Sequence, residues 1–296
     1  ACRGAVAAAH AAGGAAYTVG ITGSPGAGKS TLTDRLIVAA RERGFEGPGP
    51  VAVLAVDPSS PFSGGAILGD RVRMQGHAND EGVFIRSMAT RGHLGGLALA
   101  VPDAVRVLSA AGFPIVLVET VGVGQQEVAV AAAADSTVVV VNPGWGDAIQ
   151  ANKAGLLEIA DLFVINKADR PGARETKRDL ELMLDLSPPG DWRPPILTTV
   201  AQTGEGADEL WTAIGEHRRH LVERGELDRL RRRRLERELR QILTARVEAR
   251  VEEAVDADGA ARTLDAVTRG DLDPYAAADR LLAAIWSGDP AASDET

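Results

Sequence analysis

A short glycine-rich stretch near the start of the chain has the residue types and the spacing of a loop that binds a polyphosphate. It fits the pattern of a glycine, four residues and then Gly-Lys-Ser, and it consists of Gly23, Ser24, Pro25, Gly26, Ala27, Gly28, Lys29, Ser30 and Thr31. Small residues let consecutive backbone N–H groups turn toward phosphate oxygens, and a helix that starts there adds its positive end. Lys29 is then expected to reach the β- and γ-phosphates, and the Ser30 hydroxyl to bind Mg²⁺. We therefore predict a nucleotide site here, rather than a glycine-rich turn that binds nothing.

A second cluster indicates which base the nucleotide carries. Asn166, Lys167 and Asp169 directly follow an apolar run at 162–165. A carboxylate at Asp169 can accept from both N1–H and the exocyclic amine of guanine, whereas adenine offers no matching pair of donors. A wrong base would leave a buried charge badly paired. The Lys167 stem can cover the base plane and Asn166 can tie this loop to the phosphate loop, so the cluster predicts GTP or GDP rather than a merely charged turn.

A third base-side element is expected after the apolar run at 196–199. Guanine-binding proteins usually carry Ser-Ala at this place, and this chain has Val200, Ala201 and Gln202. Because the serine hydroxyl is missing, we expect these residues to contact the base through their backbone.

Three carboxylates are placed to bind a divalent cation. Asp57 and Glu119 end apolar runs, and Asp70 lies between them in the sequence. Mg²⁺ prefers oxygen ligands and usually keeps several waters. Each acid taken singly is more simply a loop or helix-capping residue, but three of them near a phosphate loop favour a metal site. The expected Mg²⁺ ligands, some acting through water, are Ser30, Asp57, Asp70 and Glu119.

The segment that follows Glu119 bears on hydrolysis. Gly122 has the position of the glycine in the Asp-x-x-Gly motif of GTPases, whose backbone N–H contacts the γ-phosphate. Val123 stands where Ras-like enzymes carry a glutamine that orients the attacking water. We therefore expect slow hydrolysis of GTP to GDP and phosphate, made faster by a partner or a rearranged loop. The expected catalytic residues are Lys29, Asp57, Glu119 and Gly122.

The order of apolar runs predicts the architecture that positions these residues. Short β-branched runs alternate with helical patterns, and several are apolar throughout, as in strands covered by helices on both faces. We predict an α/β P-loop NTPase fold, a doubly wound and mostly parallel sheet with its ligands at the carboxyl ends of the strands and a C-terminal helical extension. The expected strands are 17–22, 51–56, 83–85, 115–118, 137–141, 162–165 and 196–199.

The same pattern divides the chain into three parts. A short N-terminal segment at 1–16 precedes a GTPase domain at 17–225, and a helical region follows at 226–296. In that last region an apolar stripe with interleaved acids favours a helix packed on another helix across a dimer, over a nucleic-acid patch at the basic run 231–234. The stripe is formed by Leu235, Leu239, Ile242, Val247 and Val251.

Two histidines near the end of the GTPase domain have a simpler interpretation. His217 and His220 are three residues apart in a helical pattern, without cysteines or acids at metal-ligand spacing. We expect them on a solvated helix face.

Composition limits the partners and the location. Of the 296 residues, 45% are hydrophobic and 25% are charged, as in ordinary globular proteins. The formal net charge of −9 argues against nucleic acid as the main partner. One cysteine cannot form a disulfide framework, and no apolar run is long enough to span a bilayer, so we expect a cytoplasmic protein without a membrane partner.

Five further blocks make a resemblance specific: Asp57-Pro-Ser-Ser-Pro, Gly65-Ala-Ile-Leu-Gly-Asp-Arg71, Ile85-Arg-Ser-Met-Ala-Thr-Arg-Gly-His-Leu-Gly-Gly96, Glu119-Thr-Val-Gly-Val-Gly-Gln125 and Asn142-Pro-Gly-Trp-Gly-Asp-Ala-Ile-Gln150. Together they resemble the MeaB/ArgK family of GTPases, SIMIBI-type P-loop G proteins associated with methylmalonyl-CoA mutase. The resemblance covers residues 19–206, and the C-terminal helices are similar only in kind.

The resemblance implies a GTPase chaperone that docks on an adenosylcobalamin-dependent acyl-CoA mutase, gates cofactor loading by GTP hydrolysis and protects the mutase from inactivation. It also implies a homodimer through the C-terminal helices. By motif position, it assigns Mg²⁺ ligation to the four residues above and a phosphate contact to Arg73. The segment 144–153 corresponds to a mobile loop that signals the nucleotide state to the mutase.

Two other classes remain open at this point. A nickel-insertion GTPase shares the architecture but needs Cys/His metal sites, which one cysteine and five histidines do not readily form. A small-molecule kinase would transfer the phosphate to an acceptor, and the guanine cluster argues against ATP as its donor.

Overall fold

The structure is a computed structural model that describes residues 2–13, 16–58, 75–77, 79–90, 94–120, 133–144, 159–186, 188, 190–255 and 258–287. Its contacts divide the chain into two compact units, residues 1–234 and residues 235–296. Among the described residues, none of the helices combines the length and the apolar character that crossing a bilayer requires.

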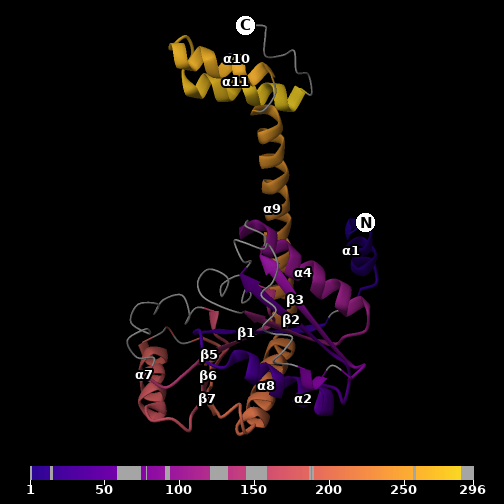
Figure 1. The fold of residues 1–296 in the computed structure, drawn as a ribbon, viewed down its shortest axis with the longest axis vertical. Helices are drawn as coiled ribbons and strands as arrows, with labels where there is room; N and C mark the ends of the chain where they lie inside the picture. The colour runs from indigo at the N-terminus through magenta and orange to yellow at the C-terminus, as the bar shows by residue number, and fades with distance from the viewer. Residues whose placement is uncertain are drawn as a thin grey trace. The chain divides into compact units, whose positions relative to one another are not determined.

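The first unit is built on a parallel sheet (Figure 1). Its seven strands lie in the order β3-β2-β4-β1-β5-β6-β7, and every neighbouring pair is parallel. Because the chain adds strands first on one side of β1 and then on the other, the sheet is doubly wound, which confirms the predicted fold. The strands are β1 (Tyr17–Gly23), β2 (Val51–Pro58), β3 (Val83–Thr90), β4 (Ile115–Thr120), β5 (Ser136–Val141), β6 (Leu162–Asn166) and β7 (Ile196–Thr199).

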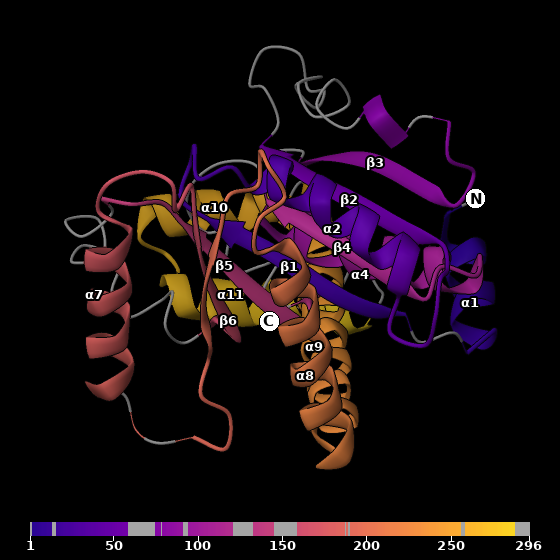
Figure 2. The ribbon, with the colours of Figure 1, turned by 90° about the horizontal axis from the view of Figure 1, so that it is seen from below.

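Helices cover both faces of the sheet. On one face lie α2 (Lys29–Arg43) and α8 (Ala207–Glu223) (Figure 2). They pack through side chains such as Leu36 and Leu210, which are both fully buried. On the other face α4 (Leu94–Ala110) packs on β2 and β4, and α7 (Ala173–Leu186) packs on β5 and β6. Central strands are therefore buried on both sides, which explains why their sequences are apolar throughout.

The remaining elements are helical. Helix α1 (Cys2–Ala11) lies against α4, and a short 3₁₀ helix, η1 (Gln75–His77), precedes β3. Helix α9 (Glu226–Val255) begins in the first unit and continues into the second, where α10 (Asp258–Arg269) packs on α11 (Pro274–Ser287). The predicted C-terminal helical extension is thus confirmed.

Strand β3 is longer than the expected run at 83–85. It pairs with β2 residue for residue, from Val83 opposite Val51 to Thr90 opposite Pro58. Phe84 and Arg86 are exposed on this edge strand, and the charged Arg86 interrupts the apolar run after Ile85. The backbone pairing with β2, which the sequence pattern does not record, extends the strand.

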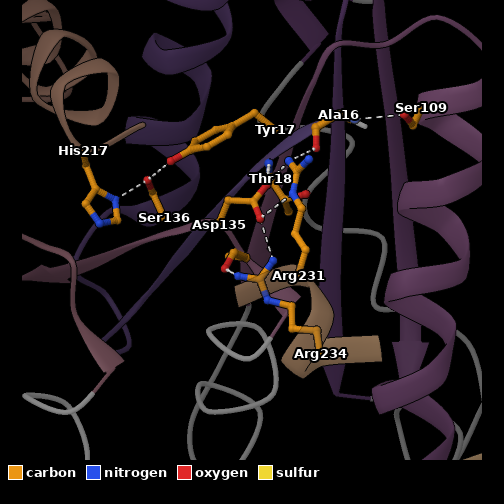
Figure 3. A network of polar contacts seen from close by, with 10 residues as sticks. Ala16, Tyr17, Thr18, Ser109, Asp135, Ser136, His217, Arg231 and Arg234 are labelled. Carbon is orange, nitrogen blue, oxygen red and sulfur yellow. Dashed lines mark hydrogen bonds and ion pairs between the residues drawn. The ribbon is translucent and has the colours of Figure 1, made fainter. Parts of the chain in front are cut away.

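A buried carboxylate holds the start of α9 against the amino ends of β1 and β5 (Figure 3). Asp135 is 2% exposed and accepts from the backbone N–H of Thr18 at 3.0 Å. It also accepts from Arg231 Nη2 at 2.8 Å and from Arg234 Nη1 at 2.6 Å. Arg231 donates further to the carbonyl of Ala16, at 3.0 Å. One acid therefore joins two arginines of α9 to the first strand of the sheet.

The two histidines show that one expectation was wrong. His217 is 2% exposed, and its Nδ1 lies 2.7 Å from the Ser136 hydroxyl, which lies 2.7 Å from the Tyr17 hydroxyl (Figure 3). Burial lowers the pKa of His217 to about 4, with the nearby His220 acting in the same direction. The imidazole is therefore neutral at pH 7 and belongs to the packed interface between α8 and β5. Helical spacing predicted a shared face for the pair but not which face is buried.

We expect Asp135→Ala to destabilise the first unit by about 3–5 kcal/mol, because removing one member of a buried ion pair leaves its partners uncompensated. Urea unfolding of the full chain, followed by tryptophan fluorescence, measures the effect. Asp103→Ala is the matched control, since Asp103 pairs with Arg106 at 2.9 Å on a partly exposed surface of α4. That pair is worth about 0–1 kcal/mol. Equal losses for the two variants would contradict the role given to Asp135.

Candidate nucleotide-binding site

The phosphate loop follows β1 at the carboxyl end of the sheet, between β4 and β5. Gly23 ends the strand with φ +129°, and a Cβ there would lie 2.0 Å from the carbonyl oxygen of Val140. Only glycine allows the loop to leave the sheet so close to β5. Helix α2 begins at Lys29, so its N-terminus faces the space that the loop encloses, as the sequence predicts.

Lys29 is held inside the loop. Its side chain is 6% exposed, and its Nζ donates to the carbonyls of Gly23 at 2.8 Å and Ser24 at 3.1 Å. The loop thus places a positive charge beside the N-terminus of α2, where a polyphosphate would meet both.

Two of the expected metal ligands are in contact. The Ser30 hydroxyl donates to Glu119 Oε1 at 2.6 Å, and Glu119 is fully buried at the end of β4. The third, Asp57, lies in β2 near the same edge, one residue beyond Val56, which pairs with Thr120. The structure does not describe its side chain. Asp70, Arg73 and Gly122 lie outside the described residues.

Asn166 joins three loops through one amide. Its Nδ2 donates to the carbonyl of Ala27 in the phosphate loop at 2.7 Å. Its Oδ1 accepts from the backbone N–H of Ala201 at 3.0 Å and from the Thr199 hydroxyl at 3.1 Å. The tie between the guanine cluster and the phosphate loop that the sequence predicts is therefore present, and it extends to the loop after β7.

The other members of the guanine cluster lie beside this amide. Lys167 has φ +60° and its Nζ donates to the carbonyl of Gly26 at 2.6 Å, so its stem lies along the phosphate loop. The N–H of Ala168 donates to the carbonyl of Thr199, and Asp169 is exposed in the turn that follows. The structure brings Lys167, Asp169 and Ala201 to adjoining loops, and contacts to a base remain a prediction.

Two side chains at this edge, those of Arg35 and Asn142, were not predicted from the sequence as site residues. Arg35 of α2 donates to the carbonyls of Ala201 and Gln202, at 3.0 and 2.9 Å. The Ser24 hydroxyl donates to Asn142 Oδ1, at 3.2 Å, just after β5. Asn142 begins a block noted in the sequence, but an arginine six residues after Lys29 carries no sequence signal of its contact.

We expect Gly28→Ala to destabilise the protein without nucleotide more than Gly26→Ala does. Both glycines have positive φ, +89° and +72°, so both variants strain the backbone. Only at Gly28 would the new Cβ lie 2.4 Å from Asn166 Nδ2, whereas nothing lies within 4 Å at Gly26. Displacing Asn166 breaks its buried hydrogen bonds, which adds about 1–3 kcal/mol to the loss in unfolding free energy. Equal losses in urea unfolding would show that Asn166 moves at no cost.

Comparison with known proteins agrees with this geometry. Residues 3–256 match the family described as methylmalonyl Co-A mutase-associated GTPase MeaB. A Pyrococcus abyssi relative with a provisional GTPase name is 52% identical over 279 residues, which are 93% of this chain and 85% of the relative. The mouse protein named methylmalonic aciduria type A homolog, mitochondrial, is 39% identical over 218 residues, 71% of this chain and 51% of that protein. A crystal structure titled LAO/AO transport system kinase, 30% identical, aligns with TM-score 0.69 over 95% of this chain and 85% of its own. The chain therefore belongs to the MeaB family of P-loop GTPases, whose substrate is a guanine nucleotide.

Proposed function

We propose that this GTPase is a chaperone for an adenosylcobalamin-dependent acyl-CoA mutase of the methylmalonyl-CoA mutase type. In this role it gates cofactor loading by GTP hydrolysis and protects the mutase from inactivation. The observation that carries the proposal is the family match over residues 3–256, because the family description names association with that mutase. The name of the mouse relative, which refers to methylmalonic aciduria, supports the same client.

The residues at the carboxyl edge of the sheet fit the substrate of such an enzyme. The phosphate loop and the N-terminus of α2 would bind the phosphates, with Lys29 exchanging its two carbonyl contacts for phosphate oxygens. Asp169 would select guanine by accepting from its two N–H groups, with Val200, Ala201 and Gln202 on the far side of the base.

The same edge fits a magnesium ion. Ser30 and Glu119 offer hydroxyl and carboxylate oxygens 2.6 Å apart, the donor type that Mg²⁺ prefers. We assign Asp57 and Asp70 as the further ligands, Arg73 as a phosphate contact and Gly122 as the γ-phosphate contact. When bound, Mg²⁺ neutralises charge on the β- and γ-phosphates.

Contacts of the described residues support a link from the nucleotide to the block at 142–150. Ser24 of the phosphate loop donates to Asn142, and Gly172, just after the guanine cluster, lies against Gly144. A Cβ at Gly172 would be 3.4 Å from the Gly144 nitrogen. Residues 142–144 therefore touch loops on both the phosphate and the base side, a suitable place from which a bound mutase could sense the nucleotide.

With Val123 at the position of a water-orienting glutamine, we expect hydrolysis to be slow until the mutase binds.

A nucleotide swap tests both the guanine site and the client. Asp169→Asn should lose guanine binding, because an amide cannot accept from both N–H groups of guanine. It should gain xanthine nucleotides, which carry a carbonyl where guanine has its amine. We expect wild-type protein with a non-hydrolysable GTP analogue to retain a cobalamin-dependent mutase from native lysate. The variant should retain it only with the corresponding xanthosine analogue.

Two results would count against the proposal. Capture of the mutase that does not depend on the nucleotide would remove the gating role. Retention of no cobalamin enzyme by either protein would remove the client.

A small-molecule kinase is the second candidate, because the solved structure at 30% identity carries a kinase title. Incubation of labelled GTP with candidate acceptors separates the two activities. A chaperone GTPase releases the label as inorganic phosphate, whereas a kinase transfers it to the acceptor.

A nickel-insertion GTPase would need a metal site of its own. Among the described residues, no group of three or more His, Cys, Asp or Glu side chains is arranged to hold a nickel ion.

We also propose that residues 226–296 form the dimerisation region and residues 17–225 the GTPase domain, after a short segment at 1–16. Helix α9 supports this assignment, because it exposes large apolar side chains at four-residue steps on one face. They are Leu235, Leu239, Leu243 and Val247, which are 46%, 58%, 54% and 44% exposed. A helix in a monomer rarely leaves such a stripe uncovered.

We expect wild-type protein to be a dimer in light scattering, and Leu239→Glu to shift it to monomer by placing a charge in the apolar stripe. Gln241→Glu is the control, since it adds the same charge at an exposed position two residues away, on another face of the helix. A monomeric wild type, or a Leu239→Glu dimer as stable as the control, would exclude α9 as the interface.

A further inference from the structure

The loop between β7 and α8 is closed by its own backbone. The N–H of Val200 donates to the carbonyl of Glu205 at 2.9 Å, and the N–H groups of Thr203 and Gly204 donate to the carbonyl of Val200, each at 3.0 Å. Gly206 follows with φ +76°, and a Cβ there would lie 2.2 Å from the carbonyl oxygen of Thr198. The ends of the loop are thereby fixed, but these bonds leave the orientation of the peptide groups at Ala201 and Gln202 to other residues.

Arg35 supplies that orientation from outside the loop. It lies in α2, and its Nε donates to the carbonyl of Ala201 at 3.0 Å while its Nη2 donates to the carbonyl of Gln202 at 2.9 Å. A planar guanidinium that donates to two successive carbonyls fixes both peptide planes, which a flexible ammonium cannot do as well. Both carbonyls are therefore directed toward α2.

Asn166 holds the same peptide segment from the other side. The N–H of Ala201 donates to Asn166 Oδ1, so this peptide bond is fixed at both its ends. The next N–H, of Gln202, has no hydrogen-bond partner within the described part of the chain. Arg35 and Asn166 thus order a loop whose free backbone donor lies next to the guanine cluster.

We propose that Arg35 is a positioning residue for guanine: by holding the carbonyls of Ala201 and Gln202, it presents the backbone N–H of Gln202 to the base and sets how long the nucleotide stays bound. The inference rests on the proposed assignment of Val200, Ala201 and Gln202 to the base side. It explains how the chain replaces the serine hydroxyl that guanine-binding proteins usually have there. It also joins base and phosphates through one helix, because α2 carries Lys29 and Ser30 at its start and Arg35 further along.

A purely structural role for Arg35 makes a different prediction. A second arginine of α2, Arg43, also reaches across to α8, where its Nη2 lies 2.6 Å from Asp208. That pair is exposed and joins α2 to the first turn of α8 instead of to the base-side loop. If Arg35 only joined α2 to the elements on its α8 side, replacing Arg35 or Arg43 should change the rate of GDP release to a similar extent.

The test measures release of a fluorescent GDP from the full chain, together with kcat and KM for GTP without a partner. We expect Arg35→Gln to release GDP about tenfold faster or more, since it loses two charge-assisted hydrogen bonds that order the loop. Its KM should rise by a similar factor while kcat changes little, because Lys29, Ser30 and Glu119 are untouched. Arg35→Lys should recover part of the loss, and Arg43→Gln should behave as wild type.

Melting temperatures of the variants without nucleotide separate misfolding from misplacement of the loop. Arg35→Gln with a wild-type melting temperature and faster release supports the proposal. Release rates equal to those of Arg43→Gln, or a fall in kcat at unchanged KM, would overturn it.

Asp169→Asn identifies which premise has failed. If that variant loses guanine while Arg35→Gln does not change release, the base site stands and the role of Arg35 is wrong. If neither variant changes GDP release, the assignment of the base side itself is wrong. Neither result depends on the mutase, so the client is tested separately.

Discussion

The candidate site depends on one buried side chain, the amide of Asn166. It ends β6, and its two polar atoms reach the phosphate loop after β1 and the loop after β7. An amide suits this place because it donates on one side and accepts on the other, whereas a carboxylate of the same size could only accept from both. At 2% exposure an unpaired polar atom would be costly, so the three loops hold one another in a single arrangement. Gly28 completes this arrangement because no side chain fits between it and Asn166.

The two edges of the sheet are stabilised in different ways. At the amino edge, Asp135 accepts from two arginines and from the backbone N–H of Thr18, and His217 is neutral and hydrogen-bonded to Ser136. These contacts hold α9 and α8 against the amino end of β5. At the carboxyl edge, Lys29 donates to carbonyl groups that phosphate oxygens could replace, and Asp169 is exposed to solvent. Parallel strands bring all the loops after the strands to that one edge, which is why residues between positions 23 and 202 meet there.

Sequence patterns predicted the parts of this arrangement that are local. The phosphate loop, the guanine cluster and the apolar strands are each contiguous, so their residue types and spacing are sufficient. The tie made by Asn166 could also be predicted, because an amide after a strand and next to the phosphate loop has few other partners. Contacts such as Arg35 to Ala201 and Arg231 to Asp135 could not, since 166 and 96 positions separate their members and many arginines could make them. The buried position of His217 was missed for a related reason, because α8 packs on β5 through tertiary contacts that periodicity does not specify.

The two halves of the proposed site differ in which contacts a bound nucleotide would replace. The base side of the proposed site is held by hydrogen bonds through Asn166, Arg35 and the closed loop at 200–205, so it would need little reorganisation to bind guanine. On the phosphate side, Lys29 donates to two carbonyls of the loop, and Ser30 donates to Glu119. In the proposed assignment, the phosphates and a cation would take over these contacts. On that assignment, the difference between GTP and GDP would act on Lys29, Ser30 and Glu119, while the base side would hold either nucleotide. A partner that responds to hydrolysis would therefore have to contact the phosphate side. The hydrogen bond from Ser24 to Asn142 links the phosphate loop to residues that such a partner could contact.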